Sequence, residues 1–317
     1  MNVARGPVAR PFLLVSLFSR ALAFRMLSLA GCSLNGPAFV SRLPVEMRIT
    51  ATGNISKITK AMKMVAAAKL RAVQERNELA RPFTDGAKDF LEPYEEVLAE
   101  IPEETVLKHV VVPITGDRGL CGGINTNVAK YVKAMLDSDS NDEVSIIAVG
   151  QKGSDAVDKL APGKTILSFR DVGNKFPMNF TQACVVAEDI VAQEYDKMTM
   201  VYTHYKNALT QTPMGFTVPS KSFLEENPEK LEEYEFDTDN EAMLSMEDLV
   251  EFQIASLLNG FILDSTTSTE AARMSAMENS TNNANELIEN LTIEYQKARQ
   301  AKITNELIEI ISGAEAV

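Results

Sequence analysis

Proline and glycine are distributed unevenly along this chain, and their distribution limits what it can fold into. Residues 47–81 hold no proline and one glycine, and residues 229–317 hold no proline and two glycines. Between these stretches, proline and glycine recur every few residues. Because both residue types disfavour the interior of a helix, their absence predicts two long helices, and their recurrence predicts short alternating elements in the middle.

Each of the two stretches also carries an apolar pattern that is typical of a coiled coil, with apolar residues at three- and four-residue intervals. In the first stretch Lys69 and Arg76 interrupt the stripe. A helix over residues 245–311 would be about 100 Å long, which exceeds a compact domain of this size. Since the whole middle of the chain lies between them, the two helices are predicted to pair antiparallel. The predicted seam consists of Ile55, Ile58, Met62, Val65, Ala72, Leu79 and Phe83, with Val250, Ile254, Leu257, Phe261, Leu287, Leu291, Tyr295 and Ala298.

The middle of the chain alternates β-rich runs with helical patterns, which predicts a small parallel α/β sheet. The predicted strands are 106–114, 144–149 and 198–205, and the predicted helices are 125–136 and 181–195. The predicted fold class is therefore α/β: a long antiparallel coiled coil of N- and C-terminal helices plus a small central Rossmann-like domain with a parallel sheet. The predicted division is a leader at 1–45, a first helix at 46–100, a central domain at 101–222, an acidic loop at 223–244 and a last helix at 245–317.

The leader differs in kind from the rest of the chain. Residues 1–45 hold five arginines, no lysine and no acidic residue. The apolar run at 12–34 is interrupted by Arg20 and Arg25, so it lacks the roughly 20 uninterrupted residues of a membrane span. This composition predicts a mitochondrial or plastid transit peptide. A signal anchor or a peripheral membrane helix is the alternative.

Charge and composition exclude several kinds of function. The chain has 31 basic and 44 acidic residues, a net charge of −13, which disfavours nucleic-acid binding. Three cysteines without CxxC spacing and two distant histidines offer no zinc site. No GxSxG motif occurs. We predict no catalytic, cofactor-binding or metal-binding residues. Residues 225–251, with twelve acidic residues and one basic residue, predict a solvated loop.

A glycine-rich turn at 116–123 follows a predicted strand and precedes a predicted helix. Backbone amides at such a turn could hold a phosphate at the start of the helix. The spacing matches neither GxGxxG nor the P-loop, however. We therefore favour the interpretation that the glycines form a tight strand-to-helix turn, which needs several positive φ angles. Cys121, within the turn, is interpreted as a small buried thiol.

A one-sign charge patch lies in the first helix. Residues 48–71 hold six basic residues and no acidic one, and Lys57, Lys60 and Lys63 repeat every three residues. A solvated helix face usually mixes both signs, so this patch indicates an acidic partner surface. In the last helix, residues 265–285 are polar and would persist as helix only if their surroundings hold them. The apolar end at 303–317 is predicted to sit inside a partner.

Four motifs, in order along residues 47–317, resemble one known family. They are ITKAMKMVAA at 58–67, DRGLCG at 117–122, AARM at 271–274, and ITNELIE at 303–309 followed by SGAEA at 312–316. Together they resemble the γ subunit of F-type ATP synthases, and the leader favours the mitochondrial form.

The resemblance implies a non-catalytic rotor shaft at the matrix side of the mitochondrial inner membrane, attached to the membrane only through its complex. Its implied partners are the α and β subunits of the catalytic ring, the membrane c-ring and small central-stalk subunits, with no nucleic acid. It implies no cofactor, because nucleotide chemistry belongs to β. Positions that the family places near the β-subunit loops and sleeve correspond to Lys60, Met62, Lys63, Arg273, Gln300, Thr304 and Glu306.

Two other functions are compatible with the residues. An organelle nucleotide-binding α/β protein could use the 116–123 turn and would bind ATP or NAD by itself. A coiled-coil adaptor would form a stable homodimer.

Overall fold

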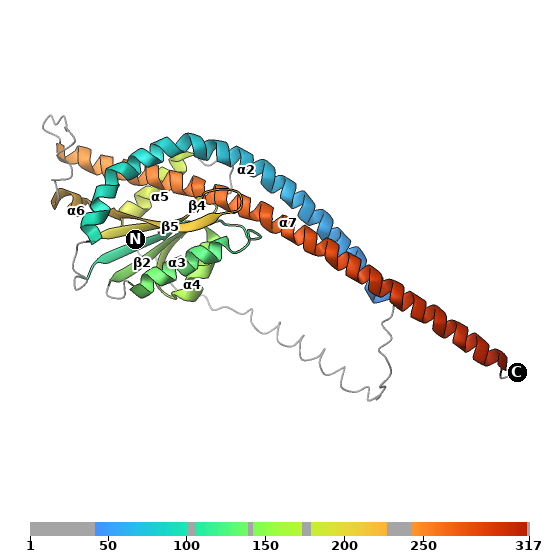
Figure 1. The fold of residues 1–317 in the computed structure, drawn as a ribbon. Coiled ribbons are helices and arrows are strands. Elements are labelled where there is room, and N and C mark those ends of the chain that lie inside the picture. Colours follow the sequence, from blue (N-terminus) through green and yellow to red (C-terminus); the bar gives the residue numbers. More distant parts are fainter. Residues whose placement is uncertain (1–41, 100–105, 139–141, 173–178, 227–241, 316–317) are drawn as a thin grey trace, which may run out of the picture. The chain divides into compact units, whose positions relative to one another are not determined.

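The structure is a computed structural model that describes residues 42–99, 106–138, 142–172, 179–226 and 242–315 (Figure 1). The described residues fall into two compact units: residues 48–292, and residues 42–47 with 293–315. Most of the predicted leader and acidic loop lies outside the described residues. Two helices reach into the ends of that loop: α6 (Lys221–Glu226) and α7 (Ala242–Glu315). Within the described ranges, no helix is both long enough and apolar enough to cross a membrane.

Five strands form one sheet in the order β3-β2-β1-β4-β5. They are β1 (Lys108–Pro113), β2 (Glu143–Val149), β3 (Thr165–Phe169), β4 (Lys197–Tyr205) and β5 (Gln211–Pro219). The three predicted strands are confirmed as β1, β2 and β4. The sheet is not purely parallel as predicted, because β5 pairs antiparallel with β4.

The sequence prediction misses the two edge strands for identifiable reasons. Strand β3 is five residues long and lacks an alternating burial pattern. Strand β5 contains Pro213 and Gly215, which normally argue against a strand. At the edge of a sheet both residues are tolerated, because one side of the strand makes no ladder hydrogen bonds.

Helices cover both faces of the sheet (Figure 1). Helices α3 (Ile124–Ser138) and α4 (Gln151–Leu160) cover one face, where Val128 and Val157 pack into a cluster with residues of β1, β2 and β4. On the other face, α5 (Phe180–Val191) packs with α7 and with α2 (Arg42–Ala99) in a larger cluster. The predicted helices at 125–136 and 181–195 correspond to α3 and α5, whereas α4 is not predicted.

Helix α4 begins in a close contact that requires glycine at two positions. Gly150 has φ +102°, and a Cβ there would lie 2.2 Å from the Thr115 carbonyl oxygen. A Cβ at Gly153 would lie 2.2 Å from Thr115 Oγ1, which instead accepts a 3.0 Å hydrogen bond from Gly153 N. The chain can therefore leave β2 and start α4 directly over the end of β1 only with glycine at both positions.

The long helices α2 and α7 pair antiparallel within the larger unit. Thr59 Oγ1 lies 2.8 Å from Thr281 Oγ1, Asn77 Nδ2 donates to Asp264 at 3.0 Å, and Thr84 lies against Gly260. As the residue number rises along α2, the number of its partner in α7 falls. The antiparallel pairing predicted from the sequence is thus confirmed, and Figure 1 shows α2 bending as it passes over the sheet.

The predicted seam on α2 is wrong by one residue. Ile58, Val65 and Phe83 are 58%, 58% and 46% exposed, and each directly precedes a residue of the true seam. One residue is 100° of helix rotation, so the large apolar stripe faces outward. The true seam has heptad spacing but small or polar residues in its first half, which a search for apolar side chains cannot find. It consists of Thr52, Thr59, Ala66, Leu70, Val73, Asn77, Thr84, Ala87, Leu91 and Tyr94.

In α7, the predicted seam residues Val250, Ile254, Leu257 and Phe261 are buried. The polar run that follows is helical because the sheet holds it. Ser265 Oγ donates to the Ile114 carbonyl at 3.2 Å, and Ser268 Oγ donates to the Thr203 carbonyl at 3.0 Å. These hydroxyl groups satisfy backbone oxygens where β1 and β4 end.

Candidate functional site: the outer surface of the paired helices

The outward face of α2 combines apolar and basic side chains. Ile55, Ile58 and Val65 are more than half exposed, and Lys57 and Lys60 are exposed beside them. Contiguous exposed apolar surface with a rim of charge is typical of a protein–protein contact. The pairing of the helices produces this face, since the true seam turns the apolar stripe of α2 away from α7.

Lys60 and Lys63 line one groove between α2 and α7, of about 530 Å³. From α7, Glu278 and Asn282 line the same groove. Met62 is half-buried and is not among its lining residues. The structure therefore brings two of the three candidate residues of α2 to one place.

Lys63 differs from Lys60 in having a partner within the chain. Its Nζ lies 2.7 Å from Glu278 Oε1, and the two side chains are 37% and 50% exposed. A pair this exposed contributes at most about 1 kcal/mol to stability, but it holds Lys63 against α7. Lys60 makes no such ion pair within the described residues, so it carries the more available charge.

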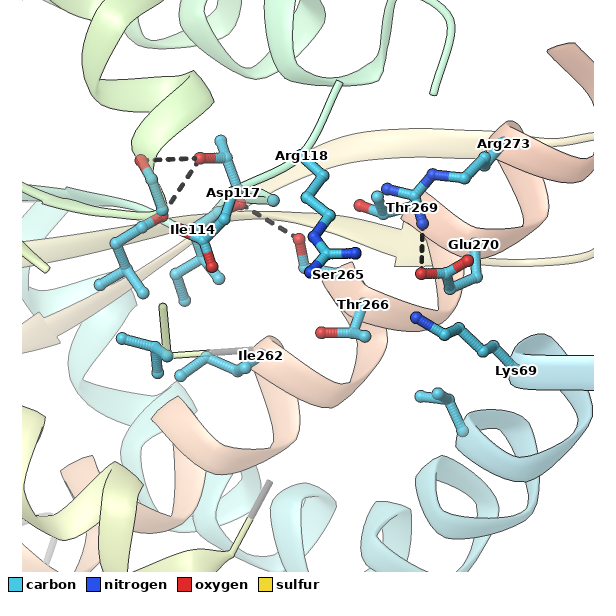
Figure 2. Close-up of a pocket in the computed structure, with 16 residues that line it drawn as sticks. Lys69, Ile114, Asp117, Arg118, Ile262, Ser265, Thr266, Thr269, Glu270 and Arg273 are labelled. Carbon is cyan, nitrogen blue, oxygen red and sulfur yellow. Dashed lines mark hydrogen bonds and ion pairs between the residues drawn. The ribbon is translucent and has the colours of Figure 1, made fainter. Parts of the chain in front are cut away.

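Arg273 lies in a second, smaller cavity of about 60 Å³, where α2, α7 and the end of β1 meet (Figure 2). Its Nη1 donates to Glu270 Oε1, and both side chains are nearly buried. Lys69 from α2 and Arg118 from the loop after β1 point toward the same place (Figure 2). Glu270 Oε2 is buried and has no hydrogen-bond partner among the described residues. The cavity is thus lined by three cations and two carboxylates, those of Glu270 and Asp117.

The glycine-rich turn beside this cavity is occupied by structural contacts. Leu120 and Gly122 have φ of 64° and 65°, as a tight turn requires. Asp117 Oδ1 accepts from Gln151 N at 3.0 Å, at the start of α4. Cys121 is buried as predicted, and burial raises the pKa of its thiol.

Helix α7 covers the place where a sheet of this kind holds a nucleotide. In open α/β sheets, that place is the crevice at the carboxyl ends of neighbouring strands where the strand order reverses, here β1 and β4. Ser265 and Ser268 bond to those two strand ends directly. The geometry therefore disfavours nucleotide binding at the 116–123 turn.

Gln300, Thr304 and Glu306 belong to the smaller unit, at the C-terminal part of α7. All three are exposed. Thr304 Oγ1 donates to the Gln300 carbonyl at 2.9 Å, and Glu306 lies 3.5 Å from Lys302. The same stretch exposes Leu307, Ile308, Ile310 and Ile311, each by more than half. A helix surface this apolar indicates a partner that covers it.

Sequence reasoning did not select Lys69, Arg118 or Glu270, which surround Arg273. Arg118 and Glu270 stand in or beside motifs that carry the family resemblance, and Lys69 interrupts the predicted seam and belongs to the basic patch at 48–71. Their common site follows from three elements that meet in space, so spacing along the chain could not show it.

Comparison with known proteins gives one consistent result. A family model described as ATP synthase matches residues 43–317. The chain is 38% identical to the mitochondrial ATP synthase subunit gamma of Arabidopsis thaliana, covering 90% of this chain and 88% of the relative. It is 37% identical to the ATP synthase gamma chain of Pelagibacter ubique, covering 86% and 98%.

Solved structures agree with the sequence relatives. A chain of the Euglena gracilis mitochondrial ATP synthase (OSCP/F1/c-ring, rotational state 3) has a TM-score of 0.73 at 26% identity, covering 87% of this chain and 94% of that one. A chain of the Tetrahymena thermophila mitochondrial ATP synthase, from the central stalk and c-ring, has a TM-score of 0.59 at 31% identity, covering 70% and 98%.

Proposed function

This chain belongs to the family of ATP synthase gamma subunits, and from that premise we propose that it is the central-stalk rotor subunit of a mitochondrial proton-driven ATP synthase. It transmits rotation of the membrane c-ring to the catalytic ring of α and β subunits. The observation that carries this function is the antiparallel pair of α2 and α7, which is anchored on a small sheet domain and exposes an apolar and basic outer face.

The chain acts at the matrix side of the mitochondrial inner membrane and is held there through its complex. Residues 1–45 serve as its transit peptide, as their arginine-rich, acid-free composition supports. The chain itself is non-catalytic. Helix α7 fills the crevice that a nucleotide would need, so nucleotide chemistry is left to the β subunits.

The surfaces that face the catalytic ring are those of the candidate residues. Lys60 is exposed on α2 and attracts an acidic loop of a β subunit, and Met62 and Lys63 flank it. Arg273 is held in position by Glu270 rather than free to move. Gln300, Thr304 and Glu306, together with the exposed apolar residues around them, form the surface that turns in the sleeve of the ring.

The helical pair must carry mechanical energy between two distant reactions. Moving one charge across 100 mV of membrane potential releases about 2.3 kcal/mol, so several charges must contribute to each ATP. Two helices joined by side-chain bonds resist twisting better than one. In the larger unit the bonds between Ser56 and Asn285, Thr59 and Thr281, and Lys63 and Glu278 supply such links.

The test is isolation of the chain from detergent-solubilised mitochondria of its own organism, with an affinity tag inside the acidic stretch 227–241. We expect α and β subunits in the eluate, together with ATP hydrolysis. A chain recovered alone, or with partners that lack ATPase activity, would refute the rotor function. Titration of the purified chain with ATP and with NAD tests the nucleotide-binding alternative. We expect the chain to bind neither nucleotide.

A further inference from the structure

One carboxylate in α7 bonds to two other elements, α2 and β4, at once. Asp264 Oδ1 accepts from Asn77 Nδ2 of α2 at 3.0 Å and from the backbone N–H of Tyr205, at the end of β4, at 3.2 Å. Asp264 Oδ2 lies 2.7 Å from Nδ1 of His204. Because an ionised carboxylate can only accept, His204 Nδ1 is the donor. Asp264 and Asn77 are 7% and 6% exposed, whereas the His204 side chain is 35% exposed, so the network reaches from the interior to the surface.

One neighbouring contact also joins these three elements, since Lys88 Nζ of α2 lies 3.5 Å from the Tyr202 hydroxyl of β4 and 5.1 Å from the centroid of the Phe261 ring of α7. The other neighbouring polar contacts join only two of them at a time. Ser265 and Ser268 attach α7 to β1 and β4 but make no bond to α2. Farther along the pair, Thr59–Thr281 and Ser56–Asn285 connect α2 with α7 without touching the sheet. Asp264 therefore stands where the link between the two helices and the link to the sheet coincide.

Directional bonds at this point have a mechanical consequence. The surrounding apolar contacts, such as the stack of Phe261 on Tyr202 at 4.0 Å, resist separation of the helix from the sheet. Apolar attraction is not directional, however, so by itself it does not single out one rotation of a helix about its own axis. Hydrogen bonds to a charged group weaken steeply when misaligned and are about twice as strong as neutral ones.

We propose that Asp264 is the positioning residue that fixes the rotational register of the helical pair on the sheet domain, so that torque passes between them without slip. This inference rests on the rotor function proposed above. Asn77 holds α2 to the carboxylate, and His204 with the Tyr205 backbone holds β4. Twist applied to the sheet domain thereby enters both helices together.

The experiment uses the assembled ATP synthase with a bead attached to the sheet domain. Lys133, exposed on α3, is replaced by Cys as the attachment point, in a background with Cys184→Ser. Two quantities are measured: the angular spread of the bead while the rotor is stalled, and the number of protons pumped per ATP hydrolysed. The first reports torsional stiffness and the second reports slip, and a residue that only maintained the fold would alter neither in a complex that assembles normally.

Asp264→Ala is expected to widen the angular spread and to lower the protons pumped per ATP. Asp264→Asn is expected to retain both, since its amide can accept from Asn77 and Tyr205 and donate to the other tautomer of His204. Thr292→Ala is the control, because the exposed Thr292 hydroxyl donates to the Ile288 carbonyl within α7 itself and belongs to none of the links between the helices or to the sheet described above. It should leave the protons per ATP unchanged.

The inference is wrong if Asp264→Ala shows the same angular spread of the bead and the same number of protons pumped per ATP as the wild type. Should that variant fail to assemble, Asn77→Ala and His204→Ala each remove a single bond of the network and decide the question in the same way. If the wild-type complex itself neither hydrolyses ATP nor rotates the bead, the rotor function fails and this inference falls with it. If the wild-type complex rotates normally and the variants show its angular spread and its protons per ATP, the inference about Asp264 is wrong while the rotor function stands.

Discussion

Among single residues, Lys60 carries a charge that the structure leaves available for a partner. It is exposed on the outer face of α2, whereas Lys63 beside it is paired with Glu278. The one-sign patch seen in the sequence therefore does not act as a uniform stripe. A change at Lys60 alters the outward charge and leaves the pairing of the helices intact.

Lys60→Glu is expected to slow ATP synthesis by the assembled complex. Replacing the attraction by a like-charge repulsion, at a cost of about 1.4 kcal/mol, lowers the affinity of this contact about tenfold. The double variant with Lys63→Glu should weaken it further but also breaks the Lys63–Glu278 pair, so the single variant is the cleaner measurement. Lys159→Glu, the same charge change on an exposed residue of α4, serves as the control. Equal ATP synthesis in both single variants would count against the acidic-loop contact.

Gly150→Ala is expected to destabilise the chain by about 3 kcal/mol or more in urea unfolding. The new methyl group would meet the Thr115 carbonyl oxygen at 2.2 Å, in addition to the strain of φ +102°. Gly163→Ala separates the two effects, because Gly163 has φ +83° but nothing within 4 Å of its absent Cβ. Its cost should be only about 1–2 kcal/mol. Similar losses in the two variants would mean that backbone strain, not the close approach, makes Gly150 necessary.

At the scale of elements, Gly260 sets how closely α7 can approach α2. A Cβ at this position would lie 2.0 Å from Thr84 Oγ1. Thr84 is buried in the true seam of α2, so neither helix has room to give way. The crossing of the two helices beside the sheet therefore depends on one missing methyl group.

Gly260→Ala should lower the free energy of unfolding by about 1–3 kcal/mol, as overpacking does. Thr84→Ala, which removes the two nearest atoms, should restore part of that loss in the double variant. Gly86→Ala in α2 is the matched control, since nothing lies within 4 Å of its absent Cβ and the change should stabilise the helix by about 0.5–1 kcal/mol. Additive effects of the Gly260 and Thr84 changes would argue against the close contact.

At the scale of the whole molecule, stability is expected to fall in alkaline solution. Burial raises the pKa of Tyr195 to about 12, and burial together with the Asp264 charge raises the pKa of Tyr202 to about 12. In the unfolded chain a tyrosine ionises near pH 10. Between pH 10 and 12 the unfolded state therefore loses protons that the folded state retains, and stability decreases by at most about 1.4 kcal/mol per pH unit for each tyrosine.

Tyr202→Phe is expected to flatten this decline, as measured by urea unfolding at pH 9, 10 and 11. The slope against pH is the relevant quantity, because loss of the hydroxyl also removes its 3.5 Å contact with Lys88 at every pH. Tyr195→Phe should flatten the slope independently. A slope that is the same in the wild type and both variants would show that neither buried tyrosine controls alkaline unfolding.

The order of most elements and the family could be predicted from the sequence. Scarcity of proline and glycine predicts the two long helices because both residues act locally on the backbone, although α2 continues beyond its proline-free stretch through Pro82 and Pro93. The β-rich runs predict β1, β2 and β4 for the same kind of reason. The four motifs are local as well, so they identify the family without any tertiary information. The edge strands β3 and β5 could not be predicted, because an edge strand tolerates proline and glycine and need not alternate buried with exposed residues.

The sequence could not show which face of α2 meets α7 or which residues surround Asp264, because both depend on the tertiary structure. A search for large apolar side chains selected the outward stripe, since the true seam is built from Thr52, Thr59 and Asn77, which gain their fit only from partners far along the chain. Asp264, His204 and Asn77 likewise come from three separate elements. Spacing within one element reports its own periodicity, whereas burial of polar groups depends on hydrogen bonds that only the folded chain supplies.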